Sequence, residues 1–142
     1  MNYLLYHNLS REGRLDGFSH GNDLWIDPTV YTIASPNDLW SATGTVIARC
    51  DVGDLNAIFA RHNRDDRPDG RIAPSLSVGD IIVINDYIHG GRYPTHPLYP
   101  DRMMNSKFFA VEPFGFTEID PPGNVSTDPD WRSARDAAES RV

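Results

Sequence analysis

The stretch SLSVGDIIVIND, residues 75–86, decides the fold of this chain. Its second half is the branched apolar run Ile81–Ile84, which Gly79-Asp80 precede and Asn85-Asp86 follow. A strand that is apolar on both faces is usually a central strand of its sheet, because neighbouring elements cover both faces. We therefore predict that residues 81–84 form a buried central strand around which the rest of the domain packs.

The first half of this stretch combines two hydroxyls, a turn and a carboxylate. Ser75 or Ser77 can bond a neighbouring backbone N–H, and Val78-Gly79 can form the corner of a turn. The Asp80 carboxylate can accept hydrogen bonds from backbone donors where the strand begins. The same groups would suit a polar ligand, but no histidine stands at a nucleophile spacing and no glycine-rich phosphate loop surrounds them. We favour a structural motif formed by Ser75, Ser77, Gly79 and Asp80.

The clearest helix precedes this stretch and is predicted over about 54–62. Asp54 can cap its first turn, because a carboxylate accepts from backbone N–H groups that have no partner inside the helix. Asn63 follows as a stop signal. Four residues recur at the spacing of one helix face: Leu55, Ile58, Phe59 and His62.

Other segments supply strands and a second, shorter helix. Ser35 as an N-cap and Pro36 at the first helical position predict a short helix near 36–42. Runs of β-branched and aromatic residues predict strands over 3–7, 29–34, 45–52 and 107–112, with FTEI as a last strand.

These elements predict an α+β fold. We expect a mostly antiparallel sheet or small open barrel, with the 54–62 helix packed on it. At 142 residues the chain is expected to hold one domain, over residues 1–119. Residues 120–142 are rich in Pro, Gly and Asp and then weakly helical, so we expect a partly ordered tail with a short helix near 129–140.

Four features occur in order along the second half of the chain: Phe-x-x-x-Asn at Phe59–Asn63, the motif Ser75–Asp80, the strand Phe108–Glu112 and the pair Gly115-Phe116. In this order and spacing they resemble the YodL-like family, whose members occur in bacteria, their mobile elements and their phages. The resemblance covers residues of about 45–119. The chain departs from the family in its long insertion at 87–106, and residues 1–44 and the C-terminal tail have no counterpart in it. The resemblance implies a fold and a genomic setting, and no reaction.

The insertion YIHGGRYPTHPLYPDRMMNS, residues 87–106, is the best candidate for a binding surface. Connections this long are uncommon in compact domains and are often functional. Tyrosine and proline supply contact area at low entropic cost, which suits a protein interface. A lid across an exposed edge of the core is an equal alternative. The predicted partner-binding residues are Tyr87, His89, Arg92, Tyr93, His96 and Tyr99.

Composition narrows the class of protein. The net charge of −7 disfavours a general phosphate-binding surface, because nucleic-acid affinity comes largely from Lys and Arg. The single cysteine, Cys50, forms no internal disulfide, and no segment looks like a signal peptide or a membrane span, so a cytoplasmic location is expected. His89 and His96 match no metal-ligand spacing, so no metal or cofactor is predicted.

The leading hypothesis is therefore a non-catalytic protein-binding or regulatory module of phage or mobile-element origin that acts on a host or element protein. No catalytic residue is predicted, since no convincing acid–base or nucleophile set is present. The alternative is a nucleic-acid- or nucleotide-associated domain, because SVGDIIVI also resembles the strand entry of small PUA- or ASCH-type barrels. An acidic DNA mimic is a variant of that alternative.

Overall fold

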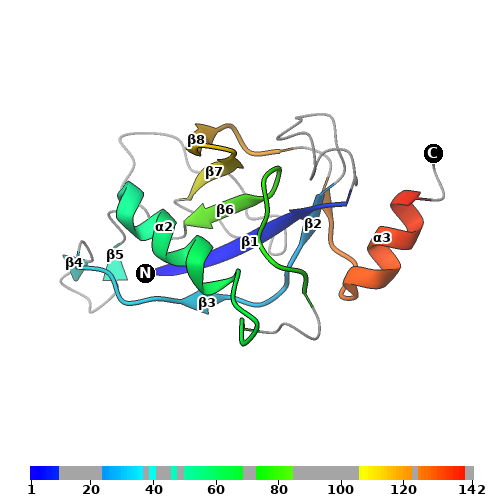
Figure 1. Cartoon of the computed structure of the whole chain (residues 1–142), viewed down its shortest axis with the longest axis horizontal. Helices are drawn as coiled ribbons and strands as arrows, with labels where there is room; N and C mark the ends of the chain where they lie inside the picture. The colour runs from blue at the N-terminus through cyan, green and yellow to red at the C-terminus, as the bar shows by residue number, and fades with distance from the viewer. Residues whose placement is uncertain are drawn as a thin grey trace.

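The computed structural model describes residues 1–9, 24–36, 39–40, 46–47, 50–68, 73–84, 106–122 and 125–139. These residues form an open seven-stranded sheet with two helices, and the predicted α+β fold is confirmed (Figure 1). Strand order is β8-β7-β6-β1-β2-β9, with β3 also paired to β1. Every pairing in this sheet is antiparallel except that of β2 with β9. The strands are β1 Asn2–Asn8, β2 Leu24–Ile26, β3 Tyr31–Thr32, β6 Ile81–Ile84, β7 Lys107–Glu112, β8 Gly115–Ile119 and β9 Val125–Ser126.

The run Ile81–Ile84 is a central strand, as predicted. It lies between β1 and β7, and its residue Val83 is level with Leu4 on one side and Phe108 on the other. All of its residues are buried. Because side chains alternate between the faces of a strand, burial of consecutive residues requires cover on both faces.

Helix α2 spans Val52–Arg61 and starts slightly earlier than predicted. Its N-cap is Asp51, whose carboxylate accepts the Asp54 N–H at 3.0 Å, while the Asp54 carboxylate accepts the Asp51 N–H at 3.0 Å. This reciprocal capping box corrects the role predicted for Asp54, which lies inside the first turn rather than before it. The acid remains stabilising there, because the N-terminal end of a helix dipole is positive.

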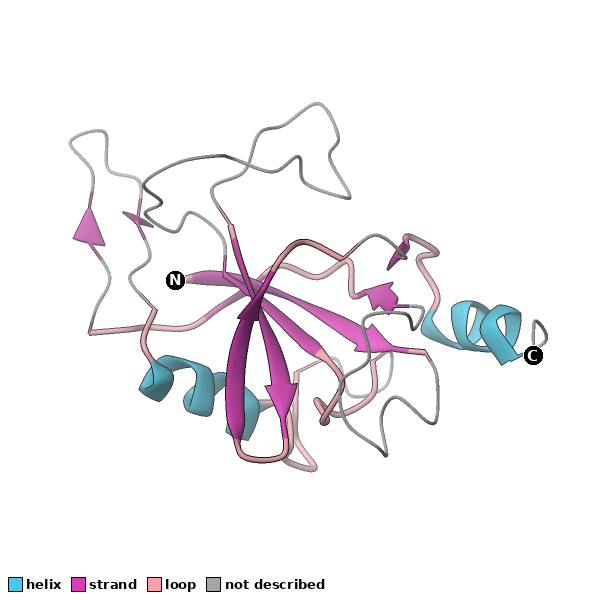
Figure 2. Ribbon diagram, turned by 90° about the horizontal axis from the view of Figure 1, so that it is seen from above, coloured by secondary structure: helices cyan, strands magenta, loops and turns pink. Residues whose placement is uncertain are grey.

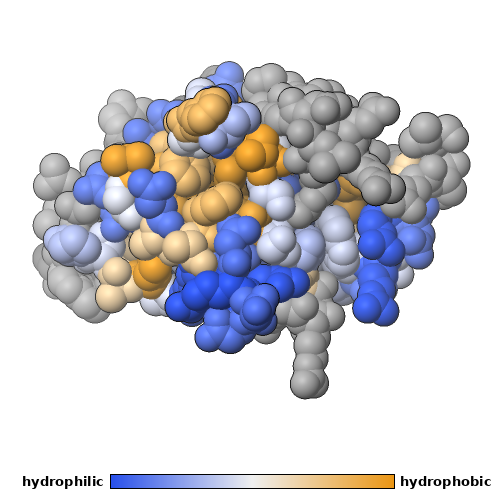
Figure 3. Space-filling model, in the orientation of Figure 1, coloured by the Kyte–Doolittle hydropathy of each residue, from blue (hydrophilic) through white to orange (hydrophobic). Residues whose placement is uncertain are grey.

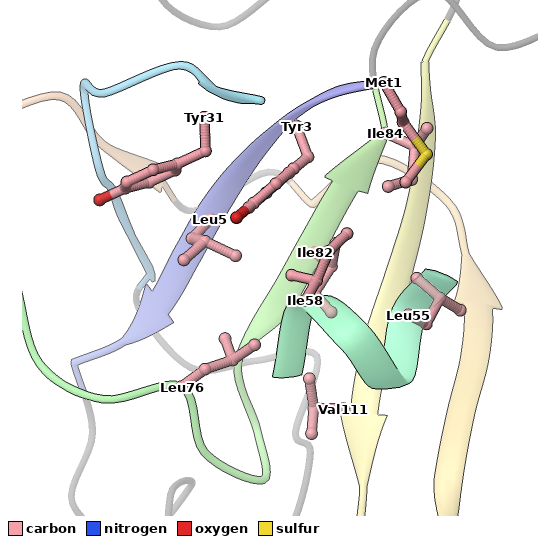
Figure 4. Packing of buried hydrophobic residues seen from close by; sticks show 10 residues of the cluster. All are labelled: Met1, Tyr3, Leu5, Tyr31, Leu55, Ile58, Leu76, Ile82, Ile84 and Val111. Carbon is pink, nitrogen blue, oxygen red and sulfur yellow. The ribbon is translucent and has the colours of Figure 1, made fainter. Parts of the chain in front are cut away.

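Helix α2 covers one face of the sheet (Figure 2). Leu55 and Ile58 point into the core beneath it, and Phe59 is half-buried at its edge (Figure 4). The core under α2 is formed by Met1, Tyr3, Leu5, Tyr31, Leu55, Ile58, Leu76, Ile82, Ile84 and Val111. The opposite face of the sheet holds a second apolar cluster of Leu4, Tyr6, Leu24, Ile26, Ile81, Val83 and Phe108.

The prediction of a short helix near 36–42 is wrong at residues 39–40, which the structure describes as a strand. Leu39–Trp40 is strand β4, which pairs antiparallel with β5, Val46–Ile47. Of the strand predicted at 45–52, Val46–Ile47 is strand β5, whereas Val52 already begins α2. A helix of two turns is marginal by itself, so pairing with a β-branched segment overrides its capping signals.

The C-terminal segment adds to the sheet and to the core. Strand β9 pairs parallel with β2, and the Trp25 indole N–H donates to the Asp128 carbonyl at 2.7 Å. Helix α3, Trp131–Glu139, follows. Asp130 accepts from the Ser133 hydroxyl at 2.8 Å, and this bond holds the pKa of the Asp130 carboxyl below its usual value. Ala134 is buried beside Trp25, so α3 is anchored to the sheet through that tryptophan.

Candidate functional site

The insertion connects β6 to β7, and these two strands stay paired up to the residues that flank it. Ile84, the end of β6, is level with Lys107, the start of β7. The sequence from 85 to 105 between them lies outside the described residues. The predicted partner-binding residues all fall there: Tyr87, His89, Arg92, Tyr93, His96 and Tyr99.

The Asp80 carboxylate is fully buried and takes part in several hydrogen bonds. Its Oδ1 accepts the Asn8 N–H at 2.8 Å, and its Oδ2 accepts the Ser77 N–H at 2.9 Å. His7 Nδ1 donates to the same Oδ2 at 3.1 Å. Asp80 therefore ties the turn before β6 to the end of β1, and these contacts support the structural interpretation of the motif.

The turn itself requires a glycine. Gly79 is buried and has a φ of +94°, a backbone conformation that side chains with a Cβ disfavour. Its N–H donates to the Val111 carbonyl at 3.0 Å, which joins the turn to β7. Ser75 and Ser77 are half-buried beside it.

The other motif residues stabilise the end of α2 and the β7–β8 hairpin. The Asn63 side-chain amide donates to the Phe59 carbonyl at 2.7 Å, which satisfies a carbonyl near the end of the helix. Phe59 packs edge-on against Phe116 of β8, with ring centroids 6.4 Å apart. Gly115 opens β8 with a φ of +121°. The helix end and the hairpin, far apart in sequence, therefore meet through two phenylalanine rings.

Sequence reasoning places His7 in a strand and assigns it no role. The imidazole is fully buried, stacks on Trp25 with centroids 5.8 Å apart and meets the edge of Trp131 at 5.9 Å. Its Nε2 has no hydrogen-bond partner among the described residues. An imidazole bonded through Nδ1 to a buried carboxylate is an arrangement that catalytic sites also use. Both side chains of the pair have no exposed surface, so a substrate has no access to them in this conformation.

A second buried polar cluster lies under α2. The Tyr3 hydroxyl is 2.8 Å from His62 Nε2 and accepts from Arg61 Nη1 at 3.2 Å. Burial raises the pKa of Tyr3 to about 12, although the Arg61 guanidinium opposes that rise. Tyr31 stacks on Tyr3 and donates its hydroxyl to the buried Asp27 carboxylate. These contacts lie within the core and connect β1, β3 and α2.

Burial also raises the pKa of Tyr6, which lies on the opposite face of the sheet. Its hydroxyl has no hydrogen-bond partner in the part of the chain that the structure describes. Within the described ranges, no group of three or more His, Cys, Asp or Glu side chains is placed to hold a metal ion. In the same part of the chain, no helix combines the length and apolar character needed to span a bilayer.

Comparison of the chain with protein-family models, with curated proteins and with solved structures finds no match. The YodL-like resemblance of residues 45–119 therefore stays a prediction that rests on its motifs.

Proposed function

We propose that this protein is a non-catalytic protein-binding or regulatory module of phage or mobile-element origin, and that its partner binds the insertion 87–106. The partner is a protein of the host cell or of the element. The location that this proposal implies is the cytoplasm of that cell.

The observation that supports this proposal is the register of β6 and β7. Because Ile84 pairs with Lys107, a turn of about two to five residues would be enough to connect the two strands. A long loop between paired strand ends costs little additional closure entropy, so the fold can tolerate the insertion. Aromatic side chains in such a long connection favour a role in binding.

The buried polar groups support the non-catalytic part of the proposal. Asp80 has three donors from the fold itself, and Tyr3 is bonded to His62 and Arg61. These contacts stabilise the sheet and the helix. The net charge of −7 supports a protein partner rather than a nucleic acid.

The test replaces residues 88–105 with a short Gly-containing turn. We expect circular dichroism and the cooperative unfolding transition to be retained, because the β6–β7 pairing stays intact. We expect loss of the partner that the full chain captures from a bacterial lysate. A matched variant keeps the length of the insertion but changes Tyr87, Tyr93 and Tyr99 to Ser, and it should lose the same partner.

Three outcomes would contradict the proposal. An unfolded shortened protein would show that the insertion is a structural lid. A shortened protein that keeps the partner would place the binding surface elsewhere. Tight binding of RNA or DNA by the full chain at low salt, with a steep loss as salt rises, would favour the nucleic-acid alternative.

A further inference from the structure

Strand β8 lies at one end of the sheet, and its outer edge is unpaired within the part of the chain that the structure describes. Among the described strands it pairs only with β7, through the register Val111↔Phe116 and Phe109↔Glu118. Open edges present unpaired backbone groups that a further strand can join, and folded proteins usually block them. The β8 edge is five residues long and carries no proline.

The hydrogen bonds of Val111 show which β8 residues face outward. The Val111 N–H donates to the Asp80 carbonyl at 2.9 Å, and its carbonyl accepts the Gly79 N–H at 3.0 Å. Both groups therefore point away from β8. Because this direction alternates along a strand, Thr117 bonds to β7, while Phe116 and Glu118 direct their N–H and C=O groups away from the sheet.

We propose that the β8 edge binds the β8 edge of a second copy of this chain, antiparallel about a two-fold axis at Thr117. In this register Phe116 lies opposite Glu118 of the second copy, and Glu118 lies opposite its Phe116. Each such pair exchanges two backbone hydrogen bonds, so all the outward-facing groups of both residues are satisfied. A two-fold interface is the commonest way in which identical chains associate.

The side chains fit this register. Thr117 faces Thr117 of the second copy, a cross-strand pair that stabilises antiparallel sheets. Glu118 forms an ion pair within its own chain with Lys107, whose Nζ lies 3.2 Å from its Oε1, and it faces a phenylalanine rather than an acid. The pairing therefore places no two like charges directly opposite each other at the centre.

The exposed Phe114 also gains a contact. Phe114 is fully exposed at the tip of the β7–β8 hairpin. The two-fold register brings Phe114 level with Asp120 of the second copy, which Pro121 follows. Figure 3 shows apolar side chains at the surface over α2, β7 and β8, next to this edge. The dimer would cover an aromatic ring that is fully exposed in the single chain.

The first test is the mass of the full-length protein in solution, by light scattering and sedimentation at up to about 1 mM, where a small interface is populated. We expect a reversible dimer that strengthens as salt rises, because salt screens the repulsion between two chains of charge −7.

Matched variants at one position test the edge. Glu118→Pro removes an outward N–H and should give a monomer with an unchanged β7 ladder, since edge strands tolerate proline where the N–H faces solvent. Glu118→Ala loses the same carboxylate but keeps the N–H, and it should stay a dimer. Phe114→Asp, outside the ladder, should weaken the dimer, whereas Val30→Asp, which changes another exposed apolar residue, should not.

Cross-linking tests the register. In a Cys50→Ser background, Thr117→Cys should form an intermolecular disulfide about tenfold faster than Glu112→Cys, because only position 117 meets its own copy across the axis. Three results would overturn the proposal. The first is a protein that stays monomeric over the whole concentration range. The second is a dimer that persists in both Glu118→Pro and Phe114→Asp. The third is cross-linking at equal rates at positions 112 and 117. Partner capture through the insertion is measured separately, so either proposal can fail without the other.

Discussion

Replacement of Asp80 by alanine should destabilise the fold strongly. The change removes the acceptor of three hydrogen bonds, from the Asn8 N–H, the Ser77 N–H and His7 Nδ1. Asn8 and His7 are fully buried, so water cannot replace the carboxylate, whereas Ser77 is half-buried. Each buried donor left unpaired costs about 1–3 kcal/mol, and relaxation recovers part of the sum. We expect a loss of about 3–5 kcal/mol in the free energy of unfolding, as for other broken buried charge networks.

Urea unfolding followed by tryptophan fluorescence and circular dichroism measures this loss. Trp25 stacks on His7, so its emission reports on this part of the core. Asp80→Asn keeps one acceptor oxygen and should lose roughly half as much, which provides a folded variant if Asp80→Ala does not fold. Asp65→Ala, at an exposed acid, should change stability by less than about 0.5 kcal/mol. An Asp80→Ala protein as stable as Asp65→Ala, but unable to bind its partner, would refute the structural role and make the motif a binding site.

Three further predictions concern the two tyrosines of β1 and the helix face. Tyr6→Phe should be neutral or stabilising by up to about 1 kcal/mol in thermal or urea unfolding, because the Tyr6 hydroxyl is buried without a partner among the described residues. Tyr3→Phe should instead cost about 1–2 kcal/mol, because the Tyr3 hydroxyl is hydrogen-bonded. The pKa of Tyr3 is about 12 in the folded state against an ordinary value of 10.0, so this tyrosine contributes stability fully below pH 10.0, and the contribution is lost as pH rises to about 12. Alkaline unfolding of Tyr3→Phe should therefore show a shallower slope in that range, and an identical slope would contradict the assignment. Ile58→Ala should cost about 3–4 kcal/mol and Phe59→Ala about 2 kcal/mol in urea unfolding, since Ile58 is fully buried and Phe59 only half-buried. A larger loss for Phe59→Ala than for Ile58→Ala would show that the buried face of the helix is assigned wrongly.

The strongest periodic patterns in the sequence determine the main elements by themselves. The doubly apolar run at Ile81–Ile84 predicts a central strand, and the spacing of Leu55 and Ile58 predicts the buried face of α2. Local signals are less decisive where segments are short. The capping pattern at Ser35-Pro36 predicts a helix where Leu39–Trp40 pairs as a strand, because two turns of helix gain less than a cross-strand partner provides.

The polar contacts of the core are decided only by the tertiary structure. The sequence indicates that Asp80 accepts turn amides, and it does so from Ser77 three residues away. Nothing in the sequence indicates that His7, 73 residues distant, donates to the same carboxylate. Nor does any local pattern show that Phe59 meets Phe116 or that β8 lies at the end of the sheet. Periodicity records which face of an element is apolar, whereas strand order and long-range pairing depend on how all the elements pack together.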